Sequence, residues 1–242
     1  MKKLIITSII LTLSFSLNAQ NWWKNKKVRG NGNVITETRT ISDFDELRVG
    51  GSFDVILVQG KERKITIKGE ENIIKYLETK VVNNTLQVKY KNNINIRTTQ
   101  KLTLTITYNN IEKISLGGSG NISNKGIISN NALRVSIEGS GNITLQINSD
   151  DVKSSIGGSG NIKLQGKSNE FICSITGSGN IKAYGLSTNN LSATITGSGN
   201  IRSTVKNKIK AKVIGSGSIY YKGKPTYIDS KSVGSGDVID KN

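Results

Sequence analysis

The residues of this sequence best suited to chemistry are basic side chains that recur at regular intervals. Three of them follow the isoleucine of a repeated motif, at Lys163, Lys182 and Arg202. Four more alternate with other residues in one short stretch, at Lys206, Lys208, Lys210 and Lys212. Ammonium and guanidinium groups gathered in this way attract carboxylate, sulfate and phosphate groups. The pattern therefore predicts a basic face that binds an anionic glycan, lipopolysaccharide or another surface polyanion.

The same basic side chains have a second interpretation, as a solvated surface without a ligand. Lysine on an exposed strand also discourages unwanted edge pairing. Like charges at neighbouring strand positions repel unless solvent or an anion screens them. The sequence leaves both interpretations open.

Other kinds of chemistry have little support in the composition. The 242 residues include no His and one Cys, which excludes Ser-His and Cys-His catalysis and the usual zinc and copper sites. Carboxylates are sparse across the repeats, whereas a glycosidase needs two that face each other. A calcium-binding glycine-rich repeat needs recurring Asp, and only Asp237 stands at the matching position. We therefore expect no catalytic residue, cofactor or metal site, and we expect Cys173 to be a buried thiol.

The net charge and the start of the chain suggest an exported protein. Lys and Arg outnumber Asp and Glu by 34 to 17. Residues 1–19 have the layout of a secretory signal peptide: a basic start, an uncharged apolar run too short to span a bilayer, and a small Ala19. We expect no transmembrane segment and a location in the periplasm, at the outer-membrane surface or outside the cell. Export and the scarcity of aromatic residues near the lysines argue against nucleic acid as a partner.

Internal repetition is the strongest signal in the sequence. The motif Gly-Ser-Gly-[Asn/Ser/Asp]-[Ile/Val] occurs seven times at intervals of 18–21 residues, starting at Gly118, Gly139, Gly158, Gly177, Gly197, Gly215 and Gly234. Looser copies start at Gly30 and Gly51. A unit this short cannot bury its own apolar face, so the units must stack. Alternating, β-branched residues before each motif indicate strands.

The predicted fold is thus all-β: a parallel β-helix or β-solenoid with about 19–21 residues per coil. Residues 20–29 are predicted to be a flexible basic lead-in, and residues 30–242 a single domain with clear repeats at 114–238. The less regular region before residue 114 is predicted to contain strands at 53–58, 64–68, 86–90 and 102–107, with a helical turn or two at 70–77. This region could cover one end of the solenoid, which otherwise exposes an unpaired edge.

Stacking places equivalent residues in columns along the solenoid. One predicted aliphatic core column contains Ile122, Ile143, Ile162, Ile181, Ile201, Ile219 and Val238. A second contains Ile137, Ile156, Ile175, Ile195 and Val213, and a column of smaller residues contains Val135, Ser154, Cys173, Ala193 and Ala211. A predicted amide ladder contains Asn121, Asn142, Asn161, Asn180 and Asn200.

The repeats carry a family resemblance. Together with FDELRVGGSFDVILVQG (Phe44 to Gly60) and NTLQVKY (Asn84 to Tyr90), they resemble the putative auto-transporter adhesin, head GIN domain family, over about Gly30 to Val238. The resemblance implies a secreted or envelope protein of Gram-negative bacteria with a β-helix-like fold. No catalytic residues come with the family.

We therefore expect a non-enzymatic, adhesin-like protein of the cell envelope. Two alternatives stay open: a purely structural envelope solenoid without a dedicated ligand, and a carbohydrate-active β-helix enzyme. Homo-oligomers are also open, because solenoid ends and apolar flanks such as Ile127-Ile128 invite contact.

Overall fold

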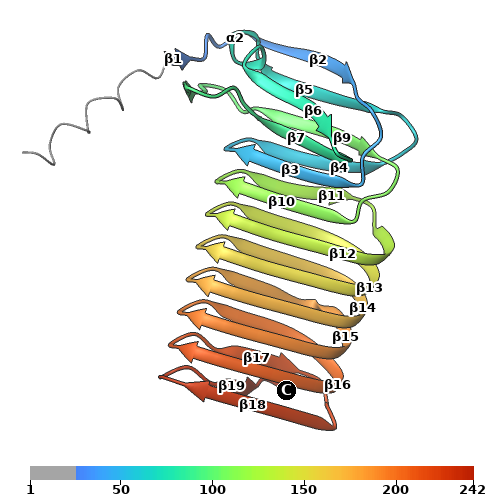
Figure 1. Cartoon of the computed structure of the whole chain (residues 1–242), viewed down its shortest axis with the longest axis vertical. Helices are drawn as coiled ribbons and strands as arrows, with labels where there is room; N and C mark the ends of the chain where they lie inside the picture. The colour runs from blue at the N-terminus through green and yellow to red at the C-terminus, as the bar shows by residue number, and fades with distance from the viewer. Residues whose placement is uncertain (1–25) are drawn as a thin grey trace, which may run out of the picture.

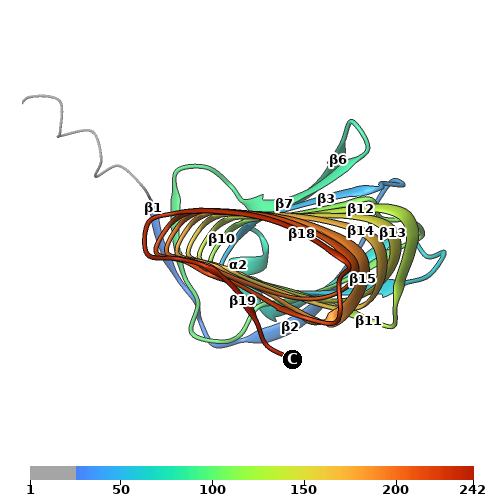
Figure 2. The ribbon, with the colours of Figure 1, turned by 90° about the horizontal axis from the view of Figure 1, so that it is seen from below.

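The computed structural model describes residues 26–242, which form a flattened β-solenoid (Figure 1). This confirms the predicted fold class. The chain winds through about seven turns, with a curled sheet at the N-terminal end. Seen along the solenoid axis, each coil is a flat loop with two long sides that enclose the core (Figure 2). Residues 1–25, with the predicted signal peptide, lie outside the described residues.

Each coil supplies one stretch of strand before its Gly-Ser-Gly turn and one after it. The stretches before the turn stack in parallel: β3 (Glu46–Gly51), β10 (Lys113–Gly118), β12 (Ile128–Gly139), the second halves of β13 (Asn142–Gly158), β14 (Asn161–Gly177), β15 (Asn180–Gly197) and β16 (Asn200–Gly215), and β18 (Tyr227–Val233). On the other side lie β4 (Asp54–Gln59), β11 (Asn121–Lys125), the first halves of β13–β16, β17 (Ile219–Lys222) and β19 (Val238–Asp240).

The Gly-Ser-Gly turn is set by close backbone contact between coils. Gly158 has a φ of 124°, and a Cβ atom there would lie 2.5 Å from the carbonyl oxygen of Gly139. A Cβ atom on Gly160 would lie 2.6 Å from the carbonyl oxygen of Gly141. Only glycine fits such a conformation and such an approach, which explains why both glycines of the motif recur.

The predicted core columns are confirmed by the register of the strands. Equivalent residues pair directly from coil to coil, as Ile162 does with Ile143 and with Ile181. The members of both aliphatic columns are buried, apart from the half-buried Val238 in the last coil. Cys173 lies buried between Ser154 and Ala193, as expected for the column of small residues.

The first coil along the chain is not the first coil of the stack. After β3 and β4 the chain leaves the solenoid, and it returns as β7 (Thr85–Tyr90) and β9 (Thr103–Tyr108), which pair in parallel with the outer edges of β3 and β4. It then crosses to β10 and β11, on the other edges of β3 and β4. The turn at Gly51 therefore stacks directly on the turn at Gly118, with the Ser119 N–H donating to the Gly51 carbonyl at 3.2 Å.

The remaining N-terminal elements cover the end of the stack. β2 (Val34–Thr40) and β5 (Lys64–Glu70) pair antiparallel, β5 pairs antiparallel with β9, and β6 (Leu77–Val82) pairs antiparallel with β7. The short helix α2 (Glu71–Ile74) confirms the predicted helical turn. We call β2, β5, α2 and β6 the cap.

Two features near the start of the chain differ from expectation. The looser motif at Gly30 is not a coil turn, because the β2 strand that follows it is antiparallel to β5 and belongs to the cap. Lys26–Arg29, the end of the predicted flexible lead-in, form strand β1, which pairs with β8 (Ile94–Arg97).

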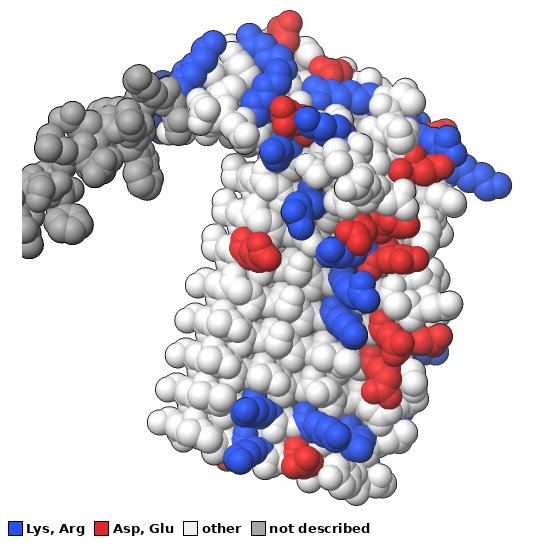
Figure 3. Space-filling view, viewed as in Figure 1, with Lys and Arg blue, Asp and Glu red and all other residues white. Residues whose placement is uncertain are grey.

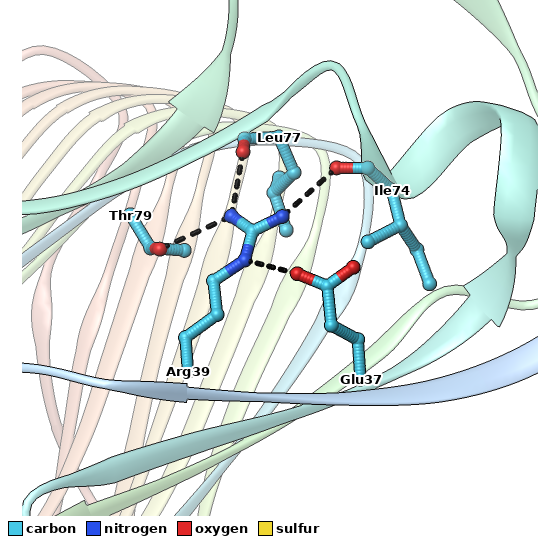
Figure 4. Close-up of polar contacts among 5 residues, drawn as sticks. All are labelled: Glu37, Arg39, Ile74, Leu77 and Thr79. Atoms are coloured by element: carbon cyan, nitrogen blue, oxygen red, sulfur yellow. Dashed lines mark hydrogen bonds and ion pairs between the residues drawn. The ribbon is translucent and has the colours of Figure 1, made fainter.

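Hydrogen bonds from Arg39 link β2 to α2 and β6 (Figure 4). Its Nε pairs with the Glu37 carboxylate at 2.6 Å. Its terminal nitrogens donate to the carbonyl oxygens of Ile74 (3.1 Å) and Leu77 (2.7 Å) and to the Thr79 hydroxyl (3.1 Å). The guanidinium thus satisfies carbonyls at the end of α2 and the start of β6, which gives this cluster a structural role.

Among the described residues, no helix has the length and apolar character needed to cross a membrane.

Candidate binding surface

The solenoid presents two broad faces with different side chains. We call the outer surface of β4, β11, β17, β19 and the first halves of β13–β16 the asparagine face. We call the outer surface of β3, β10, β12, β18 and the second halves of β13–β16 the serine face. The first is named for the amide ladder, and the second for the aligned residues Ser115, Ser136, Ser155 and Ser174.

The amide ladder is confirmed along one edge of the asparagine face. Each Asn side-chain nitrogen donates to the side-chain oxygen of the preceding coil at 2.9–3.3 Å, from Asn200 to Asn121. Asn121 in turn donates to Asp54 at 2.7 Å. These bonds satisfy neighbouring amides within the protein, so the ladder is a structural feature rather than a ligand site.

Asp54 ends the ladder, because its carboxylate accepts the hydrogen bond from Asn121. Its other carboxylate oxygen lies 2.7 Å from Lys101 Nζ. Burial would raise the pKa of Asp54, but the hydrogen bonds from Lys101 and Asn121 and the charge of Lys101 outweigh it. The pKa of Asp54 is therefore held below its usual value, and the carboxylate stays ionised.

The first three predicted basic residues form a column on the asparagine face. Lys163 pairs in register with Lys182, and Lys182 pairs with Arg202. Their neighbours along each strand are buried, so the three side chains point outward. The structure thus brings together the cations that the sequence placed after the motif isoleucines.

Three of the four other lysines share one face, and the fourth lies at a bend, whereas their alternation predicted a single face for all four. Lys206 and the residue after it are both exposed, and the register between β15 and β16 shifts at this point. The alternation breaks because the chain passes here from the asparagine face to the serine face, as every coil does between its two long sides (Figure 2). Lys210 and Lys212 lie on the serine face, next to Asp229 and Lys231. Lys208, next to Tyr227, lies on this face as well, whereas Lys206 lies at the bend.

Tyrosine rings join the basic column near the C-terminal end of the asparagine face. Arg202 lies over the Tyr220 ring at 5.1 Å, and Lys222 lies over the Tyr184 ring at 5.3 Å. Lys241 approaches the Tyr220 ring from the next coil at 5.7 Å. We call Tyr184, Arg202, Tyr220, Lys222 and Lys241 the aromatic–basic cluster.

Tyr184 is a half-buried member of this cluster. Burial raises the pKa of Tyr184, and the positive charge of Arg202 opposes that shift. Tyr184 was not among the predicted site residues, although its position carries a signal: it stands two residues after Lys182, on the same side of the strand.

A second basic column, also missed from the sequence, lies on the serine face. Lys113, Arg134 and Lys153 pair in register in three successive coils. Lys113 forms an ion pair with Glu46 at 3.1 Å. In the space-filling view, Lys and Arg run down the upper coils beside a group of acidic residues on their right, further Lys and Arg lie on the last coils, and the left side of the face is largely uncharged (Figure 3).

The described part of the chain contains no group of three or more His, Cys, Asp or Glu side chains arranged to hold a metal ion. Cys173 is buried, and burial raises the pKa of its thiol. The thiol is therefore protonated at neutral pH and is a poor nucleophile, as predicted.

Comparison with known proteins now identifies the family. Residues 43–225 match the family described as putative auto-transporter adhesin, head GIN domain. The chain belongs to this family. The sequence matches no curated protein.

Several solved structures share the fold. A putative adhesin from Bacteroides fragilis is 26% identical and superimposes with a TM-score of 0.85, over 88% of this chain and 100% of that one. A putative lipid binding protein from Parabacteroides distasonis is 26% identical with a TM-score of 0.77, over 90% of this chain and 100% of that one. A putative adhesin from Parabacteroides merdae, at 24% identity and a TM-score of 0.73, shows the fold alone. The family and the B. fragilis neighbour support a non-enzymatic, adhesin-like role at the cell surface or after export.

Proposed function

We propose that this head GIN domain protein is an exported adhesin that binds anionic glycans on its asparagine face. The proposed site is the aromatic–basic cluster together with Lys163 and Lys182. The observation that carries the proposal is the placement of two tyrosine rings among cations at the end of a basic column.

The two kinds of side chain match the two parts of an acidic sugar. A guanidinium or ammonium group binds a carboxylate, sulfate or phosphate group. A tyrosine ring offers an apolar body and a polar hydroxyl, which suits the mixed surface of a pyranose. Successive coils lie about 4.8 Å apart, so the column presents one cation per coil along the path of an extended chain.

The second basic column, on the serine face, provides an internal control for charge. We expect the triple variant Lys163→Gln/Lys182→Gln/Arg202→Gln to weaken binding to a uronic-acid or sulfated oligosaccharide by about tenfold or more, which is ~1.4 kcal/mol. The matched variant Lys113→Gln/Arg134→Gln/Lys153→Gln removes the same charge from a column of the same geometry on the serine face. It should leave the affinity nearly unchanged. Calorimetry at physiological salt measures both.

The tyrosines test recognition of the sugar as distinct from its charge. Tyr184→Ala/Tyr220→Ala keeps the net charge, so it should weaken binding while leaving the salt dependence of binding unchanged. The ligand panel includes equally charged glycans and lipopolysaccharide, since one structural neighbour is named a lipid binding protein. Equal losses in the two triple variants, or equal binding of all glycans of one charge, would refute the site and favour a structural envelope protein.

A further inference from the structure

The C-terminal end of the solenoid differs from the capped end. Within residues 26–242, the edge of β18 that faces away from β16 has no partner strand. Several apolar side chains are exposed there: Tyr227 is 50% exposed, Ile228 45% and Val233 57%, and Ile214 in the coil above is 39% exposed. A regular, unpaired edge with exposed apolar residues is a template for pairing with another strand.

We infer that this edge pairs with the same edge of a second copy of the chain, joining two solenoids end to end through a two-fold axis. In such a pair, β18 of one copy runs antiparallel to β18 of the other, with Ser230 opposite Ser230. A two-fold contact requires a surface that is complementary to itself. The sequence of β18, YIDSKSV, meets that requirement.

The outward side chains match when β18 is paired about Ser230. Asp229 of one copy lies opposite Lys231 of the other, and the symmetry repeats this ion pair. Tyr227 lies opposite Val233, also twice. Opposite charges and aromatic–β-branched pairs are the stabilising cross-strand combinations in antiparallel sheets.

Other symmetric registers lack this match. Centring the pair on Asp229 places two carboxylates opposite each other, and centring it on Lys231 places two ammonium groups opposite each other. Like charges directly opposite destabilise a sheet. The charges on β18 therefore select the register about Ser230.

The charge of the last coil is also compatible with contact between copies. From Ile219 onward the chain carries four lysines and three aspartates, whereas β16 alone carries five basic residues and no acidic residue. Two copies can thus approach at this end without the repulsion that the preceding coil would create.

Charge reversal at two exposed positions tests the pairing. Sedimentation equilibrium of the purified protein over a concentration series should show about twice the monomer mass. Asp229→Lys and Lys231→Asp each place like charges opposite each other, so each variant alone should be monomeric, with the dissociation constant raised at least tenfold. An equimolar mixture of the two variants restores opposite charges at both pairs and should form a mixed dimer. The double variant Asp229→Lys/Lys231→Asp should dimerise by itself.

Lys153→Asp provides the control, because it makes the same charge change as Lys231→Asp on the serine face four coils away from the last one. It should leave the dimer intact, and circular dichroism should show that all variants stay folded. A wild-type protein that is monomeric up to its solubility limit would overturn the inference. So would single variants that do not combine with each other, or a control that dissociates as readily as they do.

Discussion

Glu70 is a buried carboxylate at the end of β5, within the cap. Its carboxylate is 1% exposed and accepts hydrogen bonds from the Gly32 N–H (2.8 Å), the Thr99 N–H (2.8 Å) and hydroxyl (2.6 Å), and the Gln100 N–H (3.2 Å). Burial alone would raise the pKa of Glu70, but these hydrogen bonds outweigh it and lower the pKa to about 2. One side chain thus joins the segment before β2 to the loop before β9.

We predict that Glu70→Gln lowers the free energy of unfolding by about 2 kcal/mol at pH 7, because an amide presents N–H groups to donors that need an acceptor. The folded-state pKa lies below the ordinary value near 4.5, so the contribution of the carboxylate is complete at neutral pH. It is lost as the pH falls from about 4.5 toward about 2. Urea unfolding at several pH values should show the wild type and the variant converging in acid.

The neighbouring Glu71 is a suitable control for Glu70. It is exposed and accepts a hydrogen bond from the Asn33 side chain at 2.9 Å, which an amide oxygen can also accept. Glu71→Gln should change stability by less than about 0.5 kcal/mol. A Glu70→Gln protein no less stable than Glu71→Gln at pH 7 would show that the buried carboxylate does not hold the cap.

At the scale of one element, the Gly-Ser-Gly turn offers a comparison between adjacent glycines. A Cβ atom on Gly158 would lie 2.5 Å from a backbone oxygen at a φ of 124°, whereas the nearest atom to a Cβ on Gly157 is 3.9 Å away. Other coils place Glu138, Thr176 and Thr196 at the position of Gly157. A side chain would therefore be strained at Gly158 but not at Gly157.

We predict that Gly158→Ala destabilises the protein by about 3 kcal/mol, because backbone on both sides must move to admit the methyl group. Gly157→Ala should change stability by less than about 0.5 kcal/mol. Chemical denaturation of the two variants measures the difference. Equal stabilities would mean that the coils can separate locally at little cost.

At the scale of the whole molecule, the charges are unevenly neutralised. In residues 26–242 every ion pair involves residues before Ile114, although basic residues continue to Lys241. Lys163, Lys182 and Arg202 in successive coils therefore repel one another without a nearby carboxylate in an ion pair.

Salt should consequently stabilise the protein. Raising the ionic strength from about 0.01 M to 0.1 M shortens the screening length from about 30 Å to about 10 Å, which weakens this repulsion. We predict a melting temperature that rises by a few degrees in sodium chloride, and a smaller rise for Lys182→Gln. Lys167→Gln, whose register partners Asn148 and Ser187 are uncharged, should keep the wild-type salt response. A melting temperature that falls with salt would contradict this account.

The repeat allowed most of the solenoid to be predicted from the sequence. Its period set the coil length, and alternation after each motif separated inward isoleucines from outward cations such as Lys163. Stacking carries each position onto its equivalent in the next coil, so the amide ladder and the core columns followed directly. Such inferences hold wherever each contact joins residues one repeat apart.

Where neighbours in space are not one repeat apart, only the tertiary structure decided the arrangement. The coil of Gly51 stacks on that of Gly118 although 66 residues separate them, because the chain first builds the cap and the coil of β7 and β9. The bend at Lys206 divided the predicted basic face, and it brought Lys210 beside Asp229. The aromatic–basic cluster likewise combines residues of several coils. The sequence by itself thus determined the repeating coil, whereas the three-dimensional path of the chain determined which surfaces the coils build.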